Sequence, residues 1–264
     1  MSDVSYEYAG PQAGSGRGGT ARITLTNGDR GNPLTPEVAA DLIAAVLRAK
    51  ADGARIIVLG ATGRFFSVGG DLSGFGSAED PEALLLELAE GAHRFVTELV
   101  RCDAIVVSAV QGTAAGIGLP IAAAADVVLA AEGARFGLAY AKVGLSPDGG
   151  GSLLTHTLGL HTTLRLALLG DMLTAAEAQA AGLVARVVPP EDLDAAVDAV
   201  VETLLAASPD GLAASKRLIR EAAEAAPETA LRREALSISR LGGSPNGREG
   251  VAAFLGKRAP RFDC

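Results

Sequence analysis

The sequence predicts an α/β fold in which parallel strands alternate with helices and a purely helical region follows. Short apolar runs such as Ile56-Ile57-Val58-Leu59 recur between segments with helical periodicity, as expected of buried parallel strands. Helix-start signals precede several of these segments. After about residue 195 the pattern is helical throughout. We therefore expect a core over residues 1–195 and a helical region over residues 196–264.

Local signals place the elements in chain order. Thr35-Pro36 and Asp80-Pro81 each set a capping side chain before a proline at the first helical position. Thr174 and Glu177 have the spacing of a capping box. The expected strands are Val4–Tyr8, Ala21–Asn27, Arg55–Gly60, Ile105–Val110, Val127–Ala131, Phe136–Tyr140 and Val184–Val188. The expected helices cover 35–52, 80–101, 118–124, a segment after Asp148, 162–169, a segment from 174, 191–207, 209–223, 229–240 and 249–255.

Composition excludes several classes of protein. The chain has 264 residues, a net charge of −8, two cysteines and three histidines. The negative charge argues against a general nucleic-acid binder. The chain has no apolar run of membrane-spanning length, and its first ten residues do not resemble a signal peptide. Cys102 and Cys264 cannot form a disulfide framework, so we expect a cytoplasmic protein without a metal site.

The charge is unevenly distributed along the chain. Residues 1–215 carry 13 Lys and Arg against 25 Asp and Glu, whereas residues 216–264 carry 10 against 6. A basic tail on an acidic body suits a local anionic ligand, but amphipathic helices with solvated Lys and Arg faces are the more usual interpretation of such a charge pattern.

Three glycine-marked turns are the candidate sites for chemistry. They span 65–72, 112–118 and 144–150, and a fourth glycine-rich stretch at 14–19 precedes a strand, which is typical of a hairpin loop rather than a dinucleotide motif. The second turn lacks the lysine of a P-loop, but it leaves N–H groups free at a helix start. Taken singly, each of the three segments has the composition of an ordinary turn, in which Asp71 and Asp148 are turn or capping residues. His93 lies on an apolar helical stripe, where a packed histidine is the usual interpretation.

The ordered set of motifs resembles the enoyl-CoA hydratase/isomerase (crotonase) family. The motifs are Phe66-Ser67-Val68-Gly69-Gly70-Asp71-Leu72, Val110-Gln111-Gly112-Thr113-Ala114-Ala115-Gly116, Ala134-Arg135-Phe136-Gly137, Val143-Gly144-Leu145-Ser146-Pro147-Asp148, Ala178-Gln179-Ala180-Ala181-Gly182-Leu183-Val184 and Glu249-Gly250-Val251-Ala252-Ala253-Phe254-Leu255-Gly256-Lys257-Arg258. The resemblance implies a crotonase-like ββα spiral whose C-terminal helices build a homotrimer or hexamer. It also implies an acyl-CoA thioester as substrate, with coenzyme A as part of that substrate and no separate cofactor.

The same resemblance assigns binding roles to individual residues. The backbone N–H groups of Gly70 and Ile117 would hold the thioester oxygen, and a backbone donor explains why isoleucine can stand at a family glycine. Arg30 and Arg64 would lie near the CoA phosphates, and Phe254 and Lys257 would reach the CoA of a neighbouring subunit. The remaining implied contacts are the Phe66, Ser67, Val68 and Gly69 backbone near the adenine, Gly116 at the substrate, and Leu72, Tyr140 and Leu145 around the acyl group.

Differences from the family pattern decide which of the family's reactions we predict for this chain. The two glutamates of a typical hydratase are replaced by Pro120 and Tyr140, and neither side chain is a carboxylate. Asp148 falls where double-bond-shifting members carry their acid/base carboxylate. The run from Leu138 to Gly150 most resembles the 1,2-epoxyphenylacetyl-CoA isomerase branch. We therefore predict an isomerase in which Asp148 moves a proton.

Other functions remain open at this point. The chain could be an enoyl-CoA hydratase despite the missing glutamates. It could be an aryl-CoA dehalogenase-like hydrolase using Asp148 and His93, although the tryptophan of those enzymes is Tyr140 here and the chain has no tryptophan. A non-catalytic acyl-CoA-binding scaffold is the third alternative.

Overall fold

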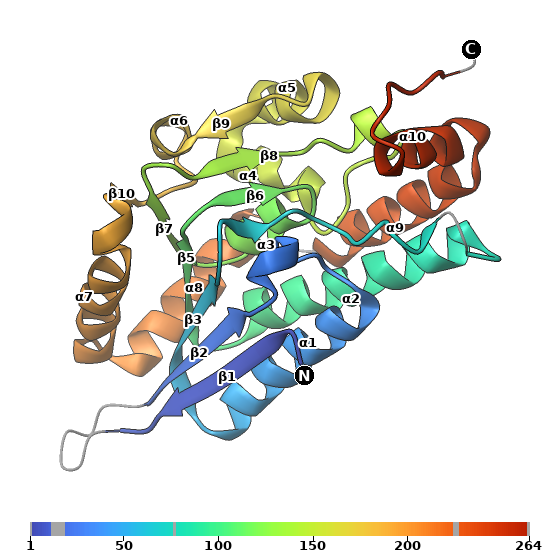
Figure 1. Ribbon diagram of the computed structural model, residues 1–264. Helices are drawn as coiled ribbons and strands as arrows, with labels where there is room; N and C mark the ends of the chain where they lie inside the picture. Colours follow the sequence, from blue (N-terminus) through green and yellow to red (C-terminus); the bar gives the residue numbers. More distant parts are fainter. Residues whose placement is uncertain (1, 12–18, 76–77, 224–226, 263–264) are drawn as a thin grey trace.

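The strands of the computed structural model, which describes residues 2–11, 19–75, 78–223 and 227–262, form two sheets (Figure 1). Within the described ranges, the large sheet has six strands in the order β1-β2-β3-β5-β7-β10, and only its β1–β2 pair is antiparallel. Its strands are β1 (Val4–Ala9), β2 (Gly19–Leu25), β3 (Ala54–Ala61), β5 (Ile105–Val110), β7 (Val127–Ala131) and β10 (Arg186–Val188). The small sheet joins β4 (Phe65–Ser67), β6 (Thr113–Ala115), β8 (Arg135–Gly137) and β9 (Met172–Thr174).

The two sheets are built by a repeating unit. A strand of the large sheet is followed by a short strand of the small sheet and then by a helix, as in β3–β4–α2 (Pro81–Arg101) and β5–β6–α3 (Gly118–Ala123). The preceding unit runs from β2 through Leu34, which bridges to Gly70, into α1 (Pro36–Ala51). This repetition confirms the predicted spiral of ββα units.

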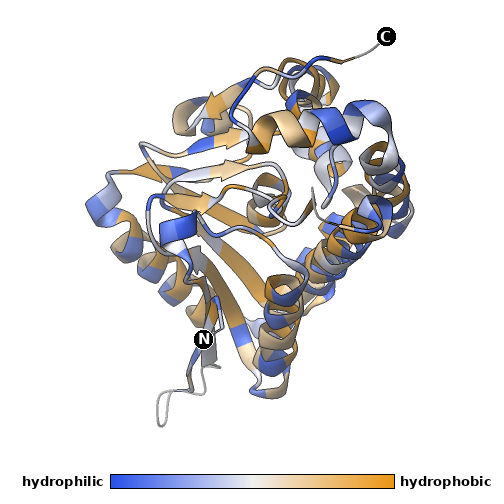
Figure 2. Cartoon of the chain, turned by 45° about the vertical axis from the view of Figure 1, so that its right-hand side comes forward, coloured by the Kyte–Doolittle hydropathy of each residue, from blue (hydrophilic) through white to orange (hydrophobic). Residues whose placement is uncertain are grey.

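The core lies on both faces of the large sheet. Successive residues of β3 alternate between two apolar clusters: Ile57 and Leu59 belong to the cluster with α1 and α2, whereas Ile56 and Val58 belong to the one with α7 (Leu193–Ala206). Figure 2 shows these strands as predominantly hydrophobic, with helices on either side. Both faces of a parallel sheet are covered, which explains the continuous apolar runs in the sequence. The expected boundary at residue 195 falls inside α7, and because α7 packs on the sheet we assign it to the core.

The helices after α7 fold back over their own chain. They are α8 (Pro209–Ala223), α9 (Pro227–Gly243) and α10 (Pro245–Leu255), and α9 packs along α2 (Figure 1). A buried lysine fixes α8: Lys216 Nζ donates to the carbonyls of Leu99 at 2.9 Å and Ala104 at 2.8 Å and pairs with Asp126 at 2.9 Å. The short helices α4 (Thr155–Leu158), α5 (Leu160–Leu169) and α6 (Ala175–Ala180) complete the set in the described ranges.

The predicted helix starts are confirmed, and the short strands were missed. Thr35 and Asp80 accept the expected capping hydrogen bonds, and Thr174 and Glu177 form the capping box. The missed strands β4, β6 and β9 have only three residues each, too few to show a period of two. The predicted strand at 136–140 is the shorter β8, and the helix expected after Asp148 begins as a 3₁₀ turn over Gly151–Leu154.

Two further expectations concern the hairpin loop at 14–19 and membrane-spanning helices. Most of the glycine-rich stretch at 14–19 lies outside the described residues, although the antiparallel pair β1–β2 flanks it as a hairpin requires. No helix in the described part of the chain is long and apolar enough to cross a membrane.

Candidate active site

The glycine-marked turns meet in a pocket of about 130 Å³ between the ends of the small sheet and the helices α2, α9 and α10. The pocket is lined by the predicted residues Val68, Gly69, Gly70, Leu72, Gly116, Ile117, Tyr140, Leu145, Asp148 and Phe254. It is also lined by residues that sequence reasoning missed: Leu85, Leu88, Ala115, Ala139, Val143 and Ile238. Leu85, Leu88 and Ile238 are ordinary apolar residues of helices and belong to no motif, whereas Ala115, Ala139 and Val143 lie within the quoted stretches but were not singled out.

Two backbone N–H groups at the pocket have no hydrogen-bond acceptor among the described residues. Gly69 has a φ of +104° and Gly116 a φ of +54°, and each directly precedes a pocket residue, Gly70 and Ile117. Glycine adopts such positive φ without steric cost, so the backbone can turn at the residue directly before each of these N–H groups. Within the described ranges, the N–H groups of Gly70 and Ile117 make no hydrogen bond to the protein. A pair of free donors at a pocket suits an oxygen that gains negative charge.

Buried side chains hold the first of these turns in place. The Ser67 hydroxyl donates to the carbonyl of Asn32 at 2.8 Å and accepts from the Gly69 N–H at 3.2 Å. Phe66 is fully buried. Ser67 and Phe66 therefore shape the turn, and only their backbone remains for the predicted adenine contact.

Asp148 is the one carboxylate among the described residues that line this pocket. It is 3% exposed, and Tyr140 donates its phenolic O–H to Asp148 Oδ1 at 2.5 Å. Burial raises the pKa of Asp148 to about 6, opposed by the Tyr140 hydrogen bond and the nearby His93 and reinforced by Glu234. Burial and the Asp148 charge raise the pKa of Tyr140 well above its usual range, so Tyr140 serves as a hydrogen-bond donor and not as a base.

The turn after Asp148 is held by side chains from two helices. Gly149 N–H donates to His93 Nε2 of α2 at 2.9 Å, and the N–H groups of Gly150 and Ser152 each donate to the Glu234 carboxylate of α9 at 2.7 Å. The helix start is therefore capped by Glu234, which replaces the capping role that the sequence allowed for Asp148. Glu234 was not foreseen, because a carboxylate that binds backbone amides leaves no sequence pattern.

His93 serves this turn as an acceptor. A backbone N–H can only donate, so Nε2 of His93 is the acceptor of the Gly149 N–H. The same Nε2 lies 3.5 Å from Glu234 Oε2, a longer separation than its hydrogen bond. His93 is thus a buried, packed histidine, as its apolar stripe indicated, and it also contacts the turn that carries Asp148.

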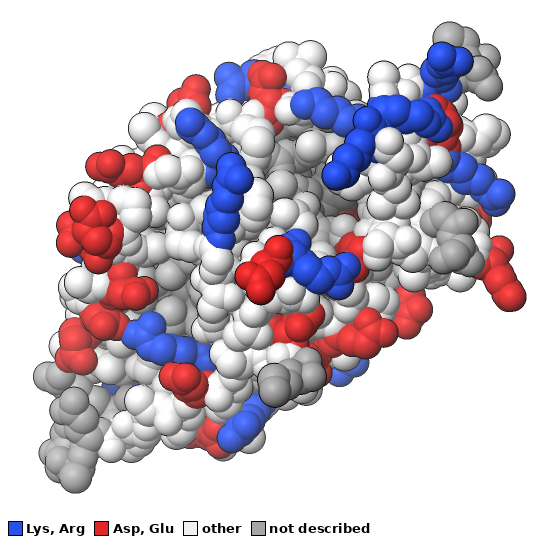
Figure 3. All heavy atoms as spheres, in the orientation of Figure 1, with Lys and Arg blue, Asp and Glu red and all other residues white. Residues whose placement is uncertain are grey.

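Three of the predicted CoA-binding residues, Arg30, Arg64 and Lys257, are not among the residues that line the pocket. Arg30 pairs with Asp71 at 2.9 Å, and the Arg64 guanidinium lies 5.2 Å from the Phe65 ring centre. Lys257 follows α10 with a φ of +51°. Figure 3 shows Lys and Arg side chains gathered over α10 and the C-terminal segment on this face.

Phe254 lines the pocket of its own chain, and its expected contact with the CoA of a neighbouring subunit stays a prediction. The physical reason for its place in the pocket is the packing of α10, which lies against α9 and the 3₁₀ turn Ala141–Val143. Gly250 permits this approach, since a Cβ there would lie 2.4 Å from the carbonyl oxygen of Val143.

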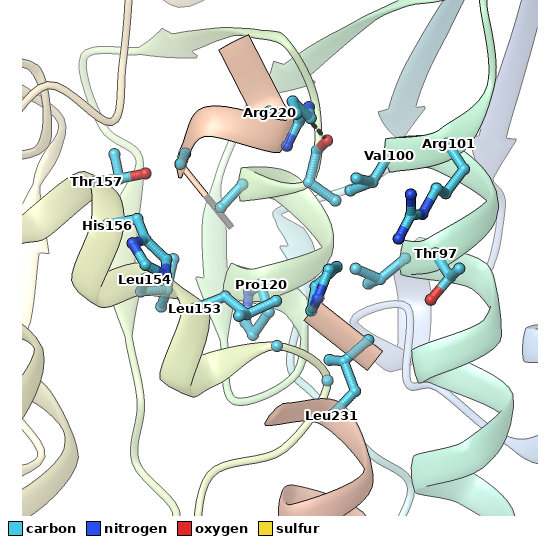
Figure 4. Close-up of a pocket in the computed structure, with 17 residues that line it drawn as sticks. Thr97, Val100, Arg101, Pro120, Leu153, Leu154, His156, Thr157, Arg220 and Leu231 are labelled. Carbon is cyan, nitrogen blue, oxygen red and sulfur yellow. Dashed lines mark hydrogen bonds between the residues drawn. The ribbon is translucent and has the colours of Figure 1, made fainter. Parts of the chain in front are cut away.

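A second cavity of about 160 Å³ contains Pro120, one of the two residues at hydratase glutamate positions. Figure 4 shows Pro120, Leu153 and Leu231 around it. Its two arginines are already paired, Arg101 with Glu228 and Arg220 with Asp126. No carboxylate is among the described residues that line it. We therefore place the chemistry in the pocket of Asp148, where a carboxylate and free N–H donors meet.

Comparisons with known proteins agree with this geometry. The family described as enoyl-CoA hydratase/isomerase matches residues 15–264. The chain is 35% identical over 250 residues to the 1,2-epoxyphenylacetyl-CoA isomerase of Escherichia coli, covering 92% of this chain and 95% of that protein. It is 32% identical over 248 residues to the trans-2-decenoyl-acyl-carrier-protein isomerase of Streptococcus mutans, covering 92% and 94%.

Solved structures give the same result. The crystal structure of an enoyl-CoA hydratase from Mycobacterium avium subsp. paratuberculosis aligns with a TM-score of 0.85 at 34% identity, covering 98% of both chains. The match extends over the spiral and the C-terminal helices together. This chain belongs to the enoyl-CoA hydratase/isomerase family.

Proposed function

We propose that the protein is an acyl-CoA isomerase that shifts a carbon–carbon double bond by proton transfer through Asp148. The observation that carries the proposal is one buried carboxylate, with a pKa raised to about 6, in a pocket that also holds two unpaired backbone donors. A base with a pKa near neutrality can both take and return a proton at working pH.

The proposed reaction needs a single acid/base group. Asp148 takes a proton from the carbon beside the thioester; the C–H electron pair forms a double bond to the thioester carbon, and the π pair of the carbonyl moves onto the thioester oxygen. The Gly70 and Ile117 N–H groups donate to the resulting dienolate oxygen. Protonated Asp148 then delivers the proton two carbons further along, and the thioester carbonyl re-forms. Tyr140 holds Oδ1 of Asp148, which leaves Oδ2 for the substrate.

The alternatives are less well supported by the site. Hydration needs a carboxylate pair to activate and place water, but Pro120 lines the other cavity and Tyr140 is hydrogen-bonded to Asp148. A dehalogenase-like hydrolysis needs a histidine that is free to activate water, and Nε2 of His93 is engaged by Gly149. A non-catalytic scaffold does not account for a buried carboxylate, because burying an acid is costly without a function for it. The relatives' names include isomerases and a hydratase, so they do not decide the reaction.

For the coenzyme A part of the substrate we propose Arg30 and Arg64 as phosphate contacts and Lys257 as a contact to the CoA of a neighbouring subunit. We also propose a homotrimer or hexamer. Its support is the exposed apolar row Leu160, Leu164 and Leu168, which lies at helical spacing on α5. Sedimentation of a stable monomer at micromolar concentration would contradict the assembly.

The test of function compares two reactions of the purified protein. We expect conversion of 3-enoyl-CoA to 2-enoyl-CoA, read by the absorbance of the conjugated thioester, and much slower hydration of crotonyl-CoA. Asp148→Asn should lower isomerisation and proton exchange with deuterated water at least about a hundredfold, with CoA thioester binding retained. Hydration that outpaces isomerisation, or exchange retained in a folded Asn variant, would overturn the proposal.

A further inference from the structure

We propose that Glu234 is a positioning residue of the active site: from α9 it holds the backbone turn that carries Asp148. Glu234 is 6% exposed, and within the described ranges no Lys or Arg pairs with it. Its two oxygens instead accept the N–H groups of Gly150 and Ser152, at 2.7 Å each. Burying a carboxylate without a cation costs free energy unless hydrogen bonds offset the loss of hydration. The two N–H groups that provide these bonds belong to the turn after Asp148, so they indicate that Glu234 holds this turn.

The turn requires such support because its backbone is unusual. Gly149 and Gly150 have φ values of +68° and +99°, and a Cβ at Gly149 would lie 2.3 Å from Cγ1 of Ile117. The two glycines therefore let the turn pass against the residue whose N–H serves the thioester oxygen. Glycine also leaves the chain free to adopt other conformations. The bonds from His93 and Glu234 select one of these, and so fix the distance between base and oxyanion donors.

Glu234 also acts on Asp148 through its charge. The titratable groups that face Asp148 are Tyr140 on its own loop, His93 on α2 and Glu234 on α9. Two accepted N–H bonds suit the ionised carboxylate of Glu234, which disfavours a second negative charge nearby. Glu234 thus raises the pKa of Asp148 and helps it to hold the transferred proton.

The experiment uses Glu234→Gln, which keeps the shape and one acceptor oxygen but removes the charge. The pKa of Asp148 is read directly by carbon NMR of labelled aspartate carboxyls, with the Asp148 signal identified by its loss in Asp148→Asn. We expect this pKa to fall in the Gln variant, and the acid limb of the pH–rate profile to move to lower pH. In the isomerase assay kcat should fall about tenfold or more, with little change in KM, because the CoA contacts are untouched.

Glu90→Gln is the matched control. Glu90 on α2 forms an exposed ion pair with Arg232 on α9, so its loss weakens the same pair of helices away from the pocket. The control should leave the Asp148 pKa and kcat unchanged. Glu234→Asp provides a second test if the Gln variant does not fold: it keeps the charge but withdraws the carboxylate, so kcat should fall while the pKa of Asp148 stays raised.

The inference rests on the proposed function only for its kinetic part. An unchanged Asp148 pKa in Glu234→Gln, or an equal fall in Glu90→Gln, would overturn it whatever the enzyme catalyses. Wild-type kcat in a folded Glu234→Asp variant would overturn it as well. The proposed function fails separately, if Asp148→Asn still isomerises the substrate.

Discussion

Asp148→Asn is expected to stabilise the protein at neutral pH while it removes the activity. Asp148 is buried, and its pKa is raised from 3.8 to about 6 in the folded chain. Between about pH 4 and pH 6 the folded state holds a proton that the unfolded state has released, so the free energy of unfolding falls as pH rises. Asparagine has no proton to lose and keeps an acceptor oxygen for the Tyr140 hydroxyl.

The size of the effect follows from the shift. About two pKa units correspond to about 3 kcal/mol, reached in full above pH 6 and absent below pH 4. For a domain of this size each kcal/mol moves the unfolding midpoint by roughly 2–4 °C. We therefore expect the Asn variant to melt several degrees above the wild type at pH 8 and at about the same temperature at pH 4.

Thermal unfolding at the two pH values provides the assay. Protein concentration must be equal in all samples, because any subunit association shifts the midpoint. Asp210→Asn, an exposed position on α8, is the control and should show no such pH-dependent gain. The reasoning is refuted if the Asn variant at position 148 is no more stable than the wild type at pH 8, or if it gains equally at pH 4.

Two further substitutions test the surroundings of Asp148. Tyr140→Phe removes a hydrogen bond that lowers the Asp148 pKa, so the acid limb of the pH–rate profile should move to higher pH; an unmoved limb contradicts the contact. Gly149→Ala places a methyl group against Ile117 and should cost more than about 1 kcal/mol of unfolding free energy. Gly53→Ala is its matched control, with a φ of +71° and nothing within 4 Å, and equal losses would show that the Ile117 contact is unimportant.

Long elements and capped helix starts could be predicted from the sequence because their signals are local. The strand Ile105–Val110 and the helix Pro209–Ala223 have the bounds that their apolar patterns indicated. The strands of the small sheet could not be found this way. Phe65–Ser67 exists as a strand because it pairs with Thr113–Ala115, almost fifty residues away, and three residues carry no periodicity of their own.

The same distinction between local sequence signals and contacts between distant residues applies to the site. Gly70, Ile117 and Asp148 were identified because each belongs to a motif with a recognisable order in the chain. The bond between Tyr140 and Asp148 was not, since their spacing of eight residues says nothing about two side chains in a loop. Glu234 escaped for the same reason, because its partners are backbone groups whose identity the sequence does not encode.

The position of α9 in the chain has a consequence for how the protein is made. Both sheets and α2 are complete by Val188, but the carboxylate that holds the Asp148 turn and the pocket residue Ile238 come from a helix translated later. A nascent chain that has folded its sheets therefore still lacks one wall of the pocket and one support of its base. The pocket is complete only after synthesis of α9 and of α10, which supplies Phe254, so a protease that removed these helices would remove pocket residues and leave the residues of both sheets in place.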